Sequence, residues 1–333
     1  MSLIFVVSTG RCGSGLLSRL LREHPDVLSL SQSLFGKASL GRRLAGRLDG
    51  RQFWKRIADP DPSMDAMVRD GLMVPEFVYP YETGRFNFRT GVPGISHMTL
   101  PALTSDPDGL YDVLAAEIPR WPTRSVPDQY RRLWSILSGD HRRSAVVERT
   151  CCSIRFVADL RRAFPEARFV YLSRDGVDCA LAMSEHAAFR LPVLARLLRA
   201  IGQTSPAGPT HPADYPVFDA KLTMECGIPP TAFGAMWSAM TRLGAATLSA
   251  MPRDSWISLR FERLVGDPAG TLRDLAQFLG ITAPPQWTSW AAGQVVPLQA
   301  DAPRLLCGAE HAELRAVCAP GYEVDRQLQA AHR

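Results

Sequence analysis

Residues 4–21 read IFVVSTGRCGSGLLSRLL, and this stretch decides the fold. Its first four residues are apolar, which is typical of a short strand buried on both faces. Residues 8–15 hold three glycines among small and hydroxylated residues, so they predict a tight loop. From Leu16 onward, leucines recur with a helical period. The stretch therefore predicts a strand, a small-residue loop and a helix.

The loop is a candidate binding site for an anion. A helix start presents unpaired backbone N–H groups and a partial positive charge, and glycines let an anion approach them closely. Gly10 and Gly15 have the spacing of the nucleoside-triphosphatase loop, but Leu16 and Leu17 follow where that motif has Lys and Ser or Thr. No glycine completes the dinucleotide motif. Arg11 supplies positive charge within the loop, and the alternative is a tight turn without a ligand.

Length and composition predict one large domain over residues 1–333. The chain is 46% hydrophobic and 21% charged, which supports a large core. A net charge of +5 suits a small anionic ligand, but the Lys/Arg clusters of a nucleic-acid binder are missing. No apolar stretch is long enough to span a membrane, and no cleavable signal is present. These features do not indicate an oligomeric state.

The cysteines indicate a reducing, cytoplasmic setting. There are seven, an odd number, with no Cys-x-x-Cys pair. Cys307, His311 and Cys318 have a spacing that could be imagined in a metal site, but a fourth ligand is missing. Buried or incidental thiols are the favoured interpretation, and no metal is predicted.

Further strands end in residues that could bind anions. Short apolar runs predict strands near residues 27–31, 144–150, 169–172 and 255–264, with helical patterns between them. This alternation favours an α/β fold with a parallel sheet, in which ligands bind beyond the carboxyl ends of the strands. We expect that edge to gather the glycine-rich loop, residues 148–150 and Ser173-Arg174. Three arginine-bearing strand ends in one place predict a ligand with several separated anionic groups.

Two Pro-rich excursions interrupt this pattern, at about residues 71–110 and 202–230. The first is rich in aromatic residues and contains His97. It is too apolar for a disordered linker. We expect the two excursions to cap the acceptor side of a pocket, and the alternative is a packed surface segment.

Several segments, in order, resemble the sulfotransferases that use 3′-phosphoadenylyl sulfate. TGRCGSGLL at residues 9–17 resembles the family's loop for the 5′-phosphosulfate, and FVYLSRDGVDCALAMS at 169–184 resembles its 3′-phosphate segment. ISLRFERLVGDPAGTLRDLAQFLGI at 257–281 resembles its Tyr/Phe-Glu-x-Leu strand and the following helix. HPDV at 24–27 and residues 148–150 also fit. The resemblance covers most of the chain and implies a P-loop-like core, with a central parallel sheet flanked by helices.

The resemblance also implies roles for individual residues. Arg174 would select the 3′-phosphate, while Arg11 and Arg149 would act catalytically near the leaving phosphate and the sulfuryl group. Positive charge and in-line positioning serve such a transfer, so no metal is required. The family's usual serine in the 3′-phosphate segment is replaced here by Ala182, with Ser184 two residues further on. The implied donor-binding residues are Arg11, Cys12, Gly13, Ser14, Gly15, Leu16, Arg174 and Ser184.

The general base departs from the family pattern. Relatives with a glutamate base carry it where this chain has Gln32, and relatives with a histidine base carry it at the position of Cys151. Glutamine cannot take up the acceptor's proton at neutral pH. His97 and Glu148 remain as candidate catalytic bases.

The resemblance thus predicts a cytoplasmic sulfotransferase. Its donor is 3′-phosphoadenylyl sulfate, and its acceptor is a hydroxyl of a small molecule. Two alternatives stay open: a small-molecule kinase, and a nucleotide-binding protein without catalysis.

Overall fold

The structure is a computed structural model that describes residues 2–34, 40–139, 143–200, 218–295 and 306–332. The chain divides into two compact units. The first unit comprises residues 1–35, 130–182 and 233–333, and the second comprises residues 36–129 and 183–232.

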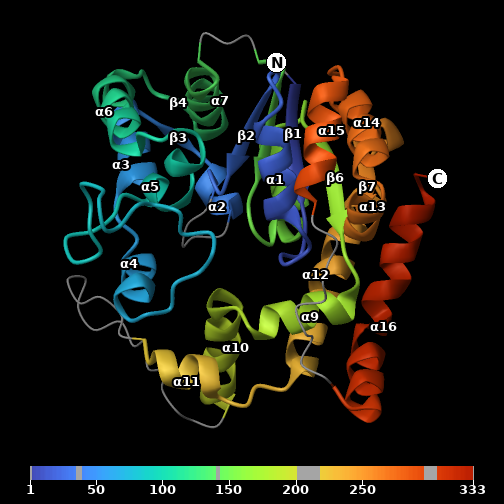
Figure 1. The fold of residues 1–333 in the computed structure, drawn as a ribbon. Coiled ribbons are helices and arrows are strands. Elements are labelled where there is room, and N and C mark those ends of the chain that lie inside the picture. Colours follow the sequence, from blue (N-terminus) through green and yellow to red (C-terminus); the bar gives the residue numbers. More distant parts are fainter. Residues whose placement is uncertain (1, 35–39, 140–142, 201–217, 296–305, 333) are drawn as a thin grey trace. The chain divides into compact units, whose positions relative to one another are not determined.

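A five-stranded parallel sheet forms the centre of the first unit, with strand order β2-β5-β1-β6-β7 (Figure 1). The strands are β1 (Ser2–Val7), β2 (Val27–Ser31), β5 (Ala145–Arg149), β6 (Arg168–Ser173) and β7 (Trp256–Arg260). The predicted central parallel sheet is therefore confirmed.

The register aligns the carboxyl ends of the strands. Arg149 at the end of β5 pairs with Val6 of β1 on one side and with Ser31 of β2 on the other. At the other side of β1, Val7 pairs with Tyr171 of β6. Because all strands run the same way, the loops that follow them lie at one edge of the sheet.

Helices flank this sheet within the first unit. Those that lie entirely in it are α1 (Ser14–Arg22), α8 (Val157–Ala163), α13 (Phe261–Gly266), α14 (Pro268–Leu279), α15 (Pro285–Gln294) and α16 (Gly308–Ala330). Three more helices span both units: α7 (Val126–Leu137), α9 (Gly176–Ser184) and α12 (Pro230–Leu248). None of the helices in the described ranges is long and apolar enough to cross a bilayer.

Helix α14 shows how the sequence sets its limits. The Asp267 carboxylate accepts a hydrogen bond from the Gly270 backbone N–H, and Pro268 occupies the first turn. Gly280 ends the helix with φ 75°, a left-handed conformation that glycine adopts without strain. The predicted strand at 255–264 is too long, however: it stops at Arg260, and Phe261 begins helix α13.

Aromatic side chains fill the core beneath the sheet. The Phe5 ring contacts Trp134, Phe164 and Phe169 with ring centroids 5.3–6.2 Å apart, and all four side chains are buried. Rings of this size contribute most of the apolar area that a core removes from water. The β1 strand that leads into the glycine-rich loop is therefore firmly held.

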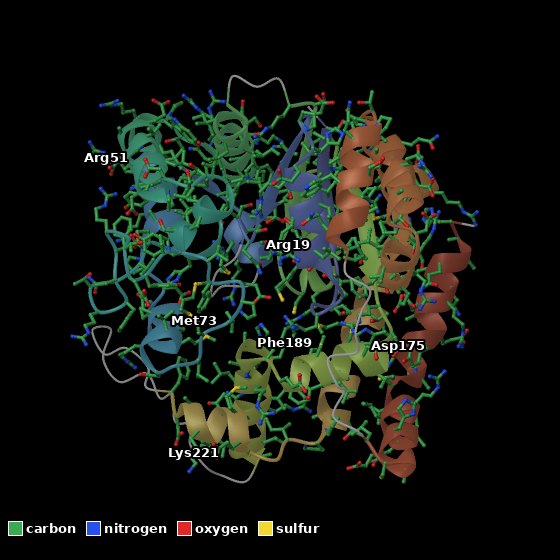
Figure 2. The ribbon with its side chains drawn as sticks, in the orientation of Figure 1. Arg19, Arg51, Met73, Asp175, Phe189 and Lys221 are labelled. Atoms are coloured by element: carbon green, nitrogen blue, oxygen red, sulfur yellow. The ribbon has the colours of Figure 1, made fainter. Side chains whose placement is uncertain are left out.

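The second unit is mainly helical. Its elements are α2 (Leu40–Leu44), α3 (Gly50–Ala58), α4 (Pro62–Arg69), α5 (Gly94–Met98), α6 (Pro107–Glu117), α10 (Ala187–Ala200), α11 (Ala220–Glu225) and the short strands β3 (Arg47–Leu48) and β4 (Arg124–Ser125). A small core cluster joins Met67, Leu72 and Val74 to Ala187 of α10. The neighbouring Met73 is 52% exposed (Figure 2).

The two Pro-rich excursions belong to this unit. The first contains α5 and the start of α6, joined by turns. In the second, residues 201–217 lie outside the described residues, and α11 follows them. The idea that these segments cap an acceptor pocket stays a prediction.

Candidate functional site

The glycine-rich loop has a backbone conformation that few sequences allow. Gly10, Arg11 and Gly13 have φ values of 87°, 55° and 84°. Two of these left-handed positions are glycines, which adopt them without strain, but Arg11 pays a conformational cost there. Gly13 stands before α1 with no side chain capping the helix, and the first turn of α1 contains no acidic residue. The first N–H groups of α1 are thus presented without a capping carboxylate, which suits an anion.

A side chain at Gly13 would collide with Phe261. A Cβ atom there would lie 2.1 Å from Cδ2 of Phe261, whose ring is buried beneath the loop. Phe261 is the first residue of α13, immediately after β7. The loop therefore packs tightly on an aromatic ring that is distant from it in sequence.

Arg174, just beyond β6, is held against the same loop. Its Nη1 donates a hydrogen bond to the backbone carbonyl of Arg11 at 3.3 Å, and its Nη2 lies 3.4 Å from the Asp178 carboxylate. The guanidinium also sits 5.1 Å from the centroid of the Phe261 ring, a cation–π contact. The Arg174 side chain is only 18% exposed, and no described residue accepts a hydrogen bond from its Nε.

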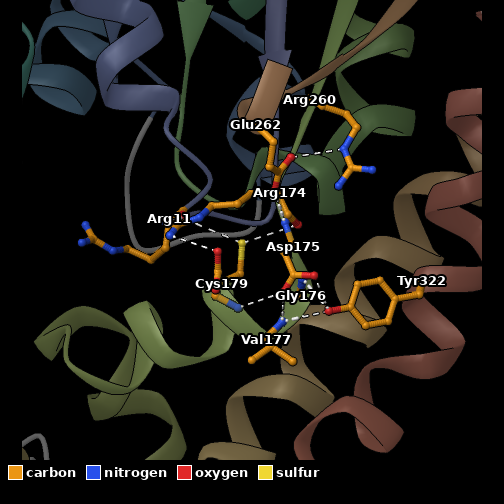
Figure 3. Close-up of polar contacts among 10 residues, drawn as sticks. Arg11, Arg174, Asp175, Gly176, Val177, Cys179, Arg260, Glu262 and Tyr322 are labelled. Atoms are coloured by element: carbon orange, nitrogen blue, oxygen red, sulfur yellow. Dashed lines mark hydrogen bonds and ion pairs between the residues drawn. The ribbon is translucent and has the colours of Figure 1, made fainter. Parts of the chain in front are cut away.

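The Arg11 side chain runs away from this contact, so Arg174 meets the loop through the Arg11 backbone (Figure 3). Two parts of the predicted anion site, the glycine-rich loop and Arg174, are therefore adjacent. That both guanidinium groups face one ligand stays a prediction.

Asp175 fixes the turn that carries Arg174 (Figure 3). Its carboxylate accepts hydrogen bonds from the Val177 N–H at 2.9 Å and from the Tyr322 hydroxyl at 2.8 Å. Its own N–H donates to the Glu262 carboxylate at 2.7 Å. Side chains from α13 and α16 thus hold the start of α9 in place.

Arg149 ends β5 as a buried cation. It is 9% exposed, and its Nη2 donates to the Ser31 hydroxyl at 3.2 Å. Ser31 Oγ in turn lies 3.1 Å from Ser18 Oγ on α1. Within the described ranges, the Arg149 Nε has no acceptor. Burying a guanidinium is costly unless an anion compensates its charge, so Arg149 is a candidate ligand contact.

Glu148 precedes Arg149 and is almost fully buried, with 1% of its surface exposed. One carboxylate oxygen, Oε1, accepts hydrogen bonds from the Thr150 hydroxyl at 2.7 Å and the Ser33 hydroxyl at 3.2 Å. Burial raises the pKa of the Glu148 carboxyl to about 7, against the smaller lowering by those hydrogen bonds and the Arg149 charge. A carboxyl with this pKa can gain and lose a proton near neutrality.

Gln32 connects the end of β2 to the loop after β5 through two hydrogen bonds. Its backbone N–H donates to the Arg149 carbonyl at 2.7 Å, and its side-chain Oε1 accepts from the Cys151 N–H at 2.8 Å.

Gln32 has φ 61° and Cys152 has φ 56°. Together with Arg11, these are the described non-glycine residues with positive φ, and each lies just beyond one of three adjacent strands. Backbone strain of this kind clusters at functional sites.

Ser153 lies just after the β5 strand end, at the start of a 3₁₀ helix (Ser153–Phe156) that precedes α8. Its hydroxyl donates a hydrogen bond to the Val6 carbonyl of β1 at 3.1 Å. Ser153 therefore ties the β5 loop to β1.

His97 lies in the second unit and is fully buried. Its Nδ1 is 2.8 Å from the Tyr81 hydroxyl, and its Nε2 is 3.4 Å from the Asp65 carboxylate. Among the described residues no acceptor forms a hydrogen bond with Nε2, so the approach to Asp65 is a close contact rather than a hydrogen bond. Tyr81 is partly exposed, so it is the end of this chain of contacts that solvent or a substrate can reach.

Ser184 also belongs to the second unit, as the last residue of α9. Its side chain is buried, and its backbone carbonyl accepts a hydrogen bond from Arg190 Nη1 at 2.6 Å. Two residues earlier, Ala182 lies in the first unit. The assignment of Ser184 to the 3′-phosphate stays a prediction.

The imagined metal ligands do not form a cluster. Cys307 is exposed before α16, whereas Cys318 is buried within that helix. Across the part of the chain that the structure describes, no group of three or more His, Cys, Asp or Glu side chains is arranged to hold a metal ion.

A sequence profile described as "Sulfotransferase family" matches residues 3–205, which include the glycine-rich loop, residues 148–150 and Arg174. The chain belongs to the sulfotransferase family. It is thus an enzyme that transfers sulfur-containing groups, built on the P-loop-like fold of that family. A search of curated protein sequences gives no match to this sulfotransferase.

Solved sulfotransferase structures are similar to this sulfotransferase at low identity. The enzyme from Alicyclobacillus acidocaldarius is 17% identical, with 99% of this chain and 96% of that chain covered and a TM-score of 0.46. The sulfotransferase STF9 from Mycobacterium avium is 12% identical, with 97% and 76% covered and a TM-score of 0.49.

Several residues that contact the candidate site residues were not singled out from the sequence. Phe261 and Glu262 stand in a segment that resembles the family, but nothing in the pattern placed them under the loop. Tyr322 lies on a helix without any motif, and Tyr81 and Asp65 carry no signature. These residues are found only through their three-dimensional contacts.

Proposed function

We propose that this sulfotransferase moves a sulfuryl group from 3′-phosphoadenylyl sulfate to a hydroxyl of a small acceptor. The observation that carries the proposal is the contact of Arg174 with the backbone of the glycine-rich loop, beside an uncapped helix start. A ligand with a phosphate at each of two positions suits a cation and a set of backbone N–H groups that lie next to each other.

In this proposal, the glycine-rich loop binds the 5′ end of the donor. The N–H groups of Cys12, Gly13, Ser14, Gly15 and Leu16 surround the phosphate, and Arg11 adds charge. Their fit to an anion is supported by the left-handed glycines and by the missing side-chain cap at Gly13. Arg174 and Ser184 bind the 3′-phosphate, and the Arg174 Nε, which no described residue accepts from, is one donor for it.

Transfer then depends on stabilising charge on the leaving phosphate. As the sulfuryl group departs, negative charge grows on the phosphate oxygen, and Arg11 and Arg149 stabilise it. Arg149 is well suited because it is buried, where electrostatic interactions are stronger, and because Ser31 fixes its orientation. Arginines can supply this charge without a metal ion.

We propose two routes for the acceptor's proton. Glu148, with a pKa of about 7, takes it through the hydroxyl of Thr150 or Ser33, since both donate to its carboxylate. His97 takes it through Tyr81, and Asp65 stabilises the resulting imidazolium. In both routes the buried group acts through a hydroxyl rather than by touching the acceptor.

The acceptor side is assigned to the Pro-rich excursions at 71–110 and 202–230, whose aromatic residues favour a lipid- or sugar-like molecule. A cytoplasmic location fits the free cysteines of this protein.

The direct test is transfer of radiolabelled sulfate from 3′-phosphoadenylyl sulfate to a panel of alcohols, phenols and sugars. We expect labelled product that forms equally with and without EDTA. Transfer of phosphate from ATP that stops with EDTA would instead identify a kinase. Tight binding of 3′,5′-diphosphoadenosine with no labelled product from any acceptor would identify a non-catalytic binding protein.

A further inference from the structure

Two cysteines stand side by side directly after the Glu148-Arg149-Thr150 strand end. Cys151 and Cys152 are consecutive residues, and their Sγ atoms are 3.4 Å apart. In an extended strand, neighbouring side chains point to opposite faces. The left-handed φ of 56° at Cys152 ends that alternation and brings the two thiols together.

The pair is in contact with the glycine-rich loop. The Cys152 thiol donates a hydrogen bond to the Thr9 carbonyl at 3.3 Å, one residue before Gly10. The Ile154 N–H donates to the Ser8 carbonyl at 3.3 Å. The loop between β1 and α1 therefore rests on the chain that carries the two thiols.

Both residues of the pair are partly exposed. By contrast, Cys12 and Cys179, which also lie by the loop, are buried. Two effects raise the pKa of the Cys152 thiol well above its ordinary value: the larger is its hydrogen bond with Cys151, and the smaller is burial. The positive charge of Arg155 has a smaller, opposite effect on the pKa of the Cys152 thiol. The raised pKa keeps the Cys152 thiol protonated, as its hydrogen bond to the Thr9 carbonyl requires, and we assign the first oxidation to Cys151.

We infer that Cys151 and Cys152 form an oxidation site, at which hydrogen peroxide joins the two thiols in a disulfide and thereby weakens binding to the glycine-rich loop. Nothing in the proposed sulfuryl transfer uses these sulfurs. The inference concerns the same loop as the proposed donor site, and its second part rests on that proposal.

The chemistry balances with peroxide as the oxidant. The Cys151 sulfur attacks one peroxide oxygen, the O–O bond breaks, and one water leaves as Cys151 becomes a sulfenic acid. The Cys152 sulfur then attacks the oxidised sulfur, and the S–O bond breaks with release of a second water. Two thiols and one peroxide give one disulfide and two waters, so both sulfurs are oxidised and both peroxide oxygens are reduced.

The resulting disulfide is strained and therefore easily reduced. Adjacent Cα atoms are about 3.8 Å apart, shorter than the ~4.4–6.8 Å that disulfides usually span. Strain of this kind raises the reduction potential. The site is thus suited to reversible modification rather than to a permanent cross-link.

Oxidation changes the loop because it removes a hydrogen-bond donor. The Cys152 thiol loses its hydrogen, so the contact with the Thr9 carbonyl is lost. The two sulfur atoms also have to approach from 3.4 Å to about 2.05 Å, which moves the backbone next to Gln32. The predicted result is a loop that binds its anion less well.

The first readout needs no donor. The full-length protein is treated with hydrogen peroxide, its free thiols are alkylated, and tryptic peptides are analysed by mass spectrometry. We expect the peptide with Cys151 and Cys152 to lose two hydrogens and both alkyl groups, and dithiothreitol to restore them. If both cysteines are alkylated after peroxide treatment that oxidises other thiols, the oxidation site is refuted.

The second readout is calorimetry with 3′,5′-diphosphoadenosine before and after oxidation. We expect about tenfold weaker binding after oxidation, reversed by dithiothreitol. This loss of affinity on oxidation should be absent in Cys151→Ser and in Cys152→Ser. It should be retained in Cys307→Ser, which removes an exposed thiol outside the loop. An unchanged affinity with the disulfide confirmed by mass refutes the effect on binding. Failure of the reduced wild type to bind would instead count against the proposed donor site.

Discussion

The guanidinium of Arg174 lies 3.3 Å from the backbone carbonyl of Arg11, although 163 positions separate the two residues in sequence. This contact joins the loop after β6 to the loop after β1. Neighbouring parallel strands bring both loops to one edge of the sheet, and Phe261 packs against both. The donor site proposed for this sulfotransferase is built on that contact.

Replacing Gly13 with alanine should destabilise the protein and weaken diphosphoadenosine binding. The new Cβ would lie 2.1 Å from the Phe261 ring, at a residue whose φ is 84°. We expect a loss of about 1–3 kcal/mol in the free energy of unfolding, measured with urea. Gly293→Ala in α15 is the control, since a Cβ there meets nothing within 4 Å, alanine favours the helix, and the residue is not part of the proposed donor site. Equal stabilities of the two variants would contradict the packing described here.

Replacing Glu148 with glutamine should remove a pH-dependent part of the stability. Burial raises the pKa of this carboxyl from 4.5 to about 7, so the folded state binds more protons than the unfolded state between these values. Its contribution is therefore fully present below about pH 4.5 and is lost as the pH rises through 7. The loss amounts to about 3 kcal/mol.

The measurement for Glu148 is urea unfolding of wild type and Glu148→Gln from pH 4.5 to 8. We expect the difference in unfolding free energy to shift in favour of the glutamine variant as the pH rises. Parallel curves for the two proteins would show that Glu148 keeps its ordinary pKa.

Replacing Tyr81 with phenylalanine should lower turnover and leave nucleotide affinity unchanged. The change removes the hydroxyl that contacts His97 and keeps the ring that packs beside it. General acid–base groups contribute about 10²–10⁴-fold to rates, so we expect a loss in this range, with an altered pH profile of kcat. Tyr111→Phe is the control, because Tyr111 is another partly exposed tyrosine of the same unit. An unchanged kcat and pH profile would remove the route through Tyr81 and His97, leaving Glu148.

Much of the fold could be predicted from the sequence because local patterns carry it. The apolar run before Ser8 and the glycines after it predicted β1, the loop and α1. The end of β7 was missed, since apolar residues alternate with Ser258 and Arg260 up to Phe261, a pattern that favours continuing the strand. The helix begins there because Phe261 turns into the space beneath Gly13, a tertiary effect.

The candidate site was only partly predictable for the same reason. Arg11, Arg149 and Arg174 were found because they follow strands, and parallel strands bring their ends together. The residues that orient these arginines and Glu148 could not be found in this way. Tyr322 reaches Asp175 from the C-terminal helix, and the hydroxyls around Glu148 come from two strand ends. No local pattern encodes such contacts, because they depend on how distant elements pack.

The most direct test of the account is calorimetry of Arg174→Ala with 3′,5′-diphosphoadenosine and with adenosine 5′-phosphate, which lacks the 3′-phosphate. A hydrogen bond to a charged group is worth about 1.5–3 kcal/mol, so we expect a roughly 10- to 100-fold loss of affinity for the diphosphate and less than about a twofold loss for the monophosphate. Arg263→Ala, which removes an exposed arginine paired with Asp274, should change neither. Equal losses for both nucleotides in Arg174→Ala would contradict the assignment of Arg174 to the 3′-phosphate.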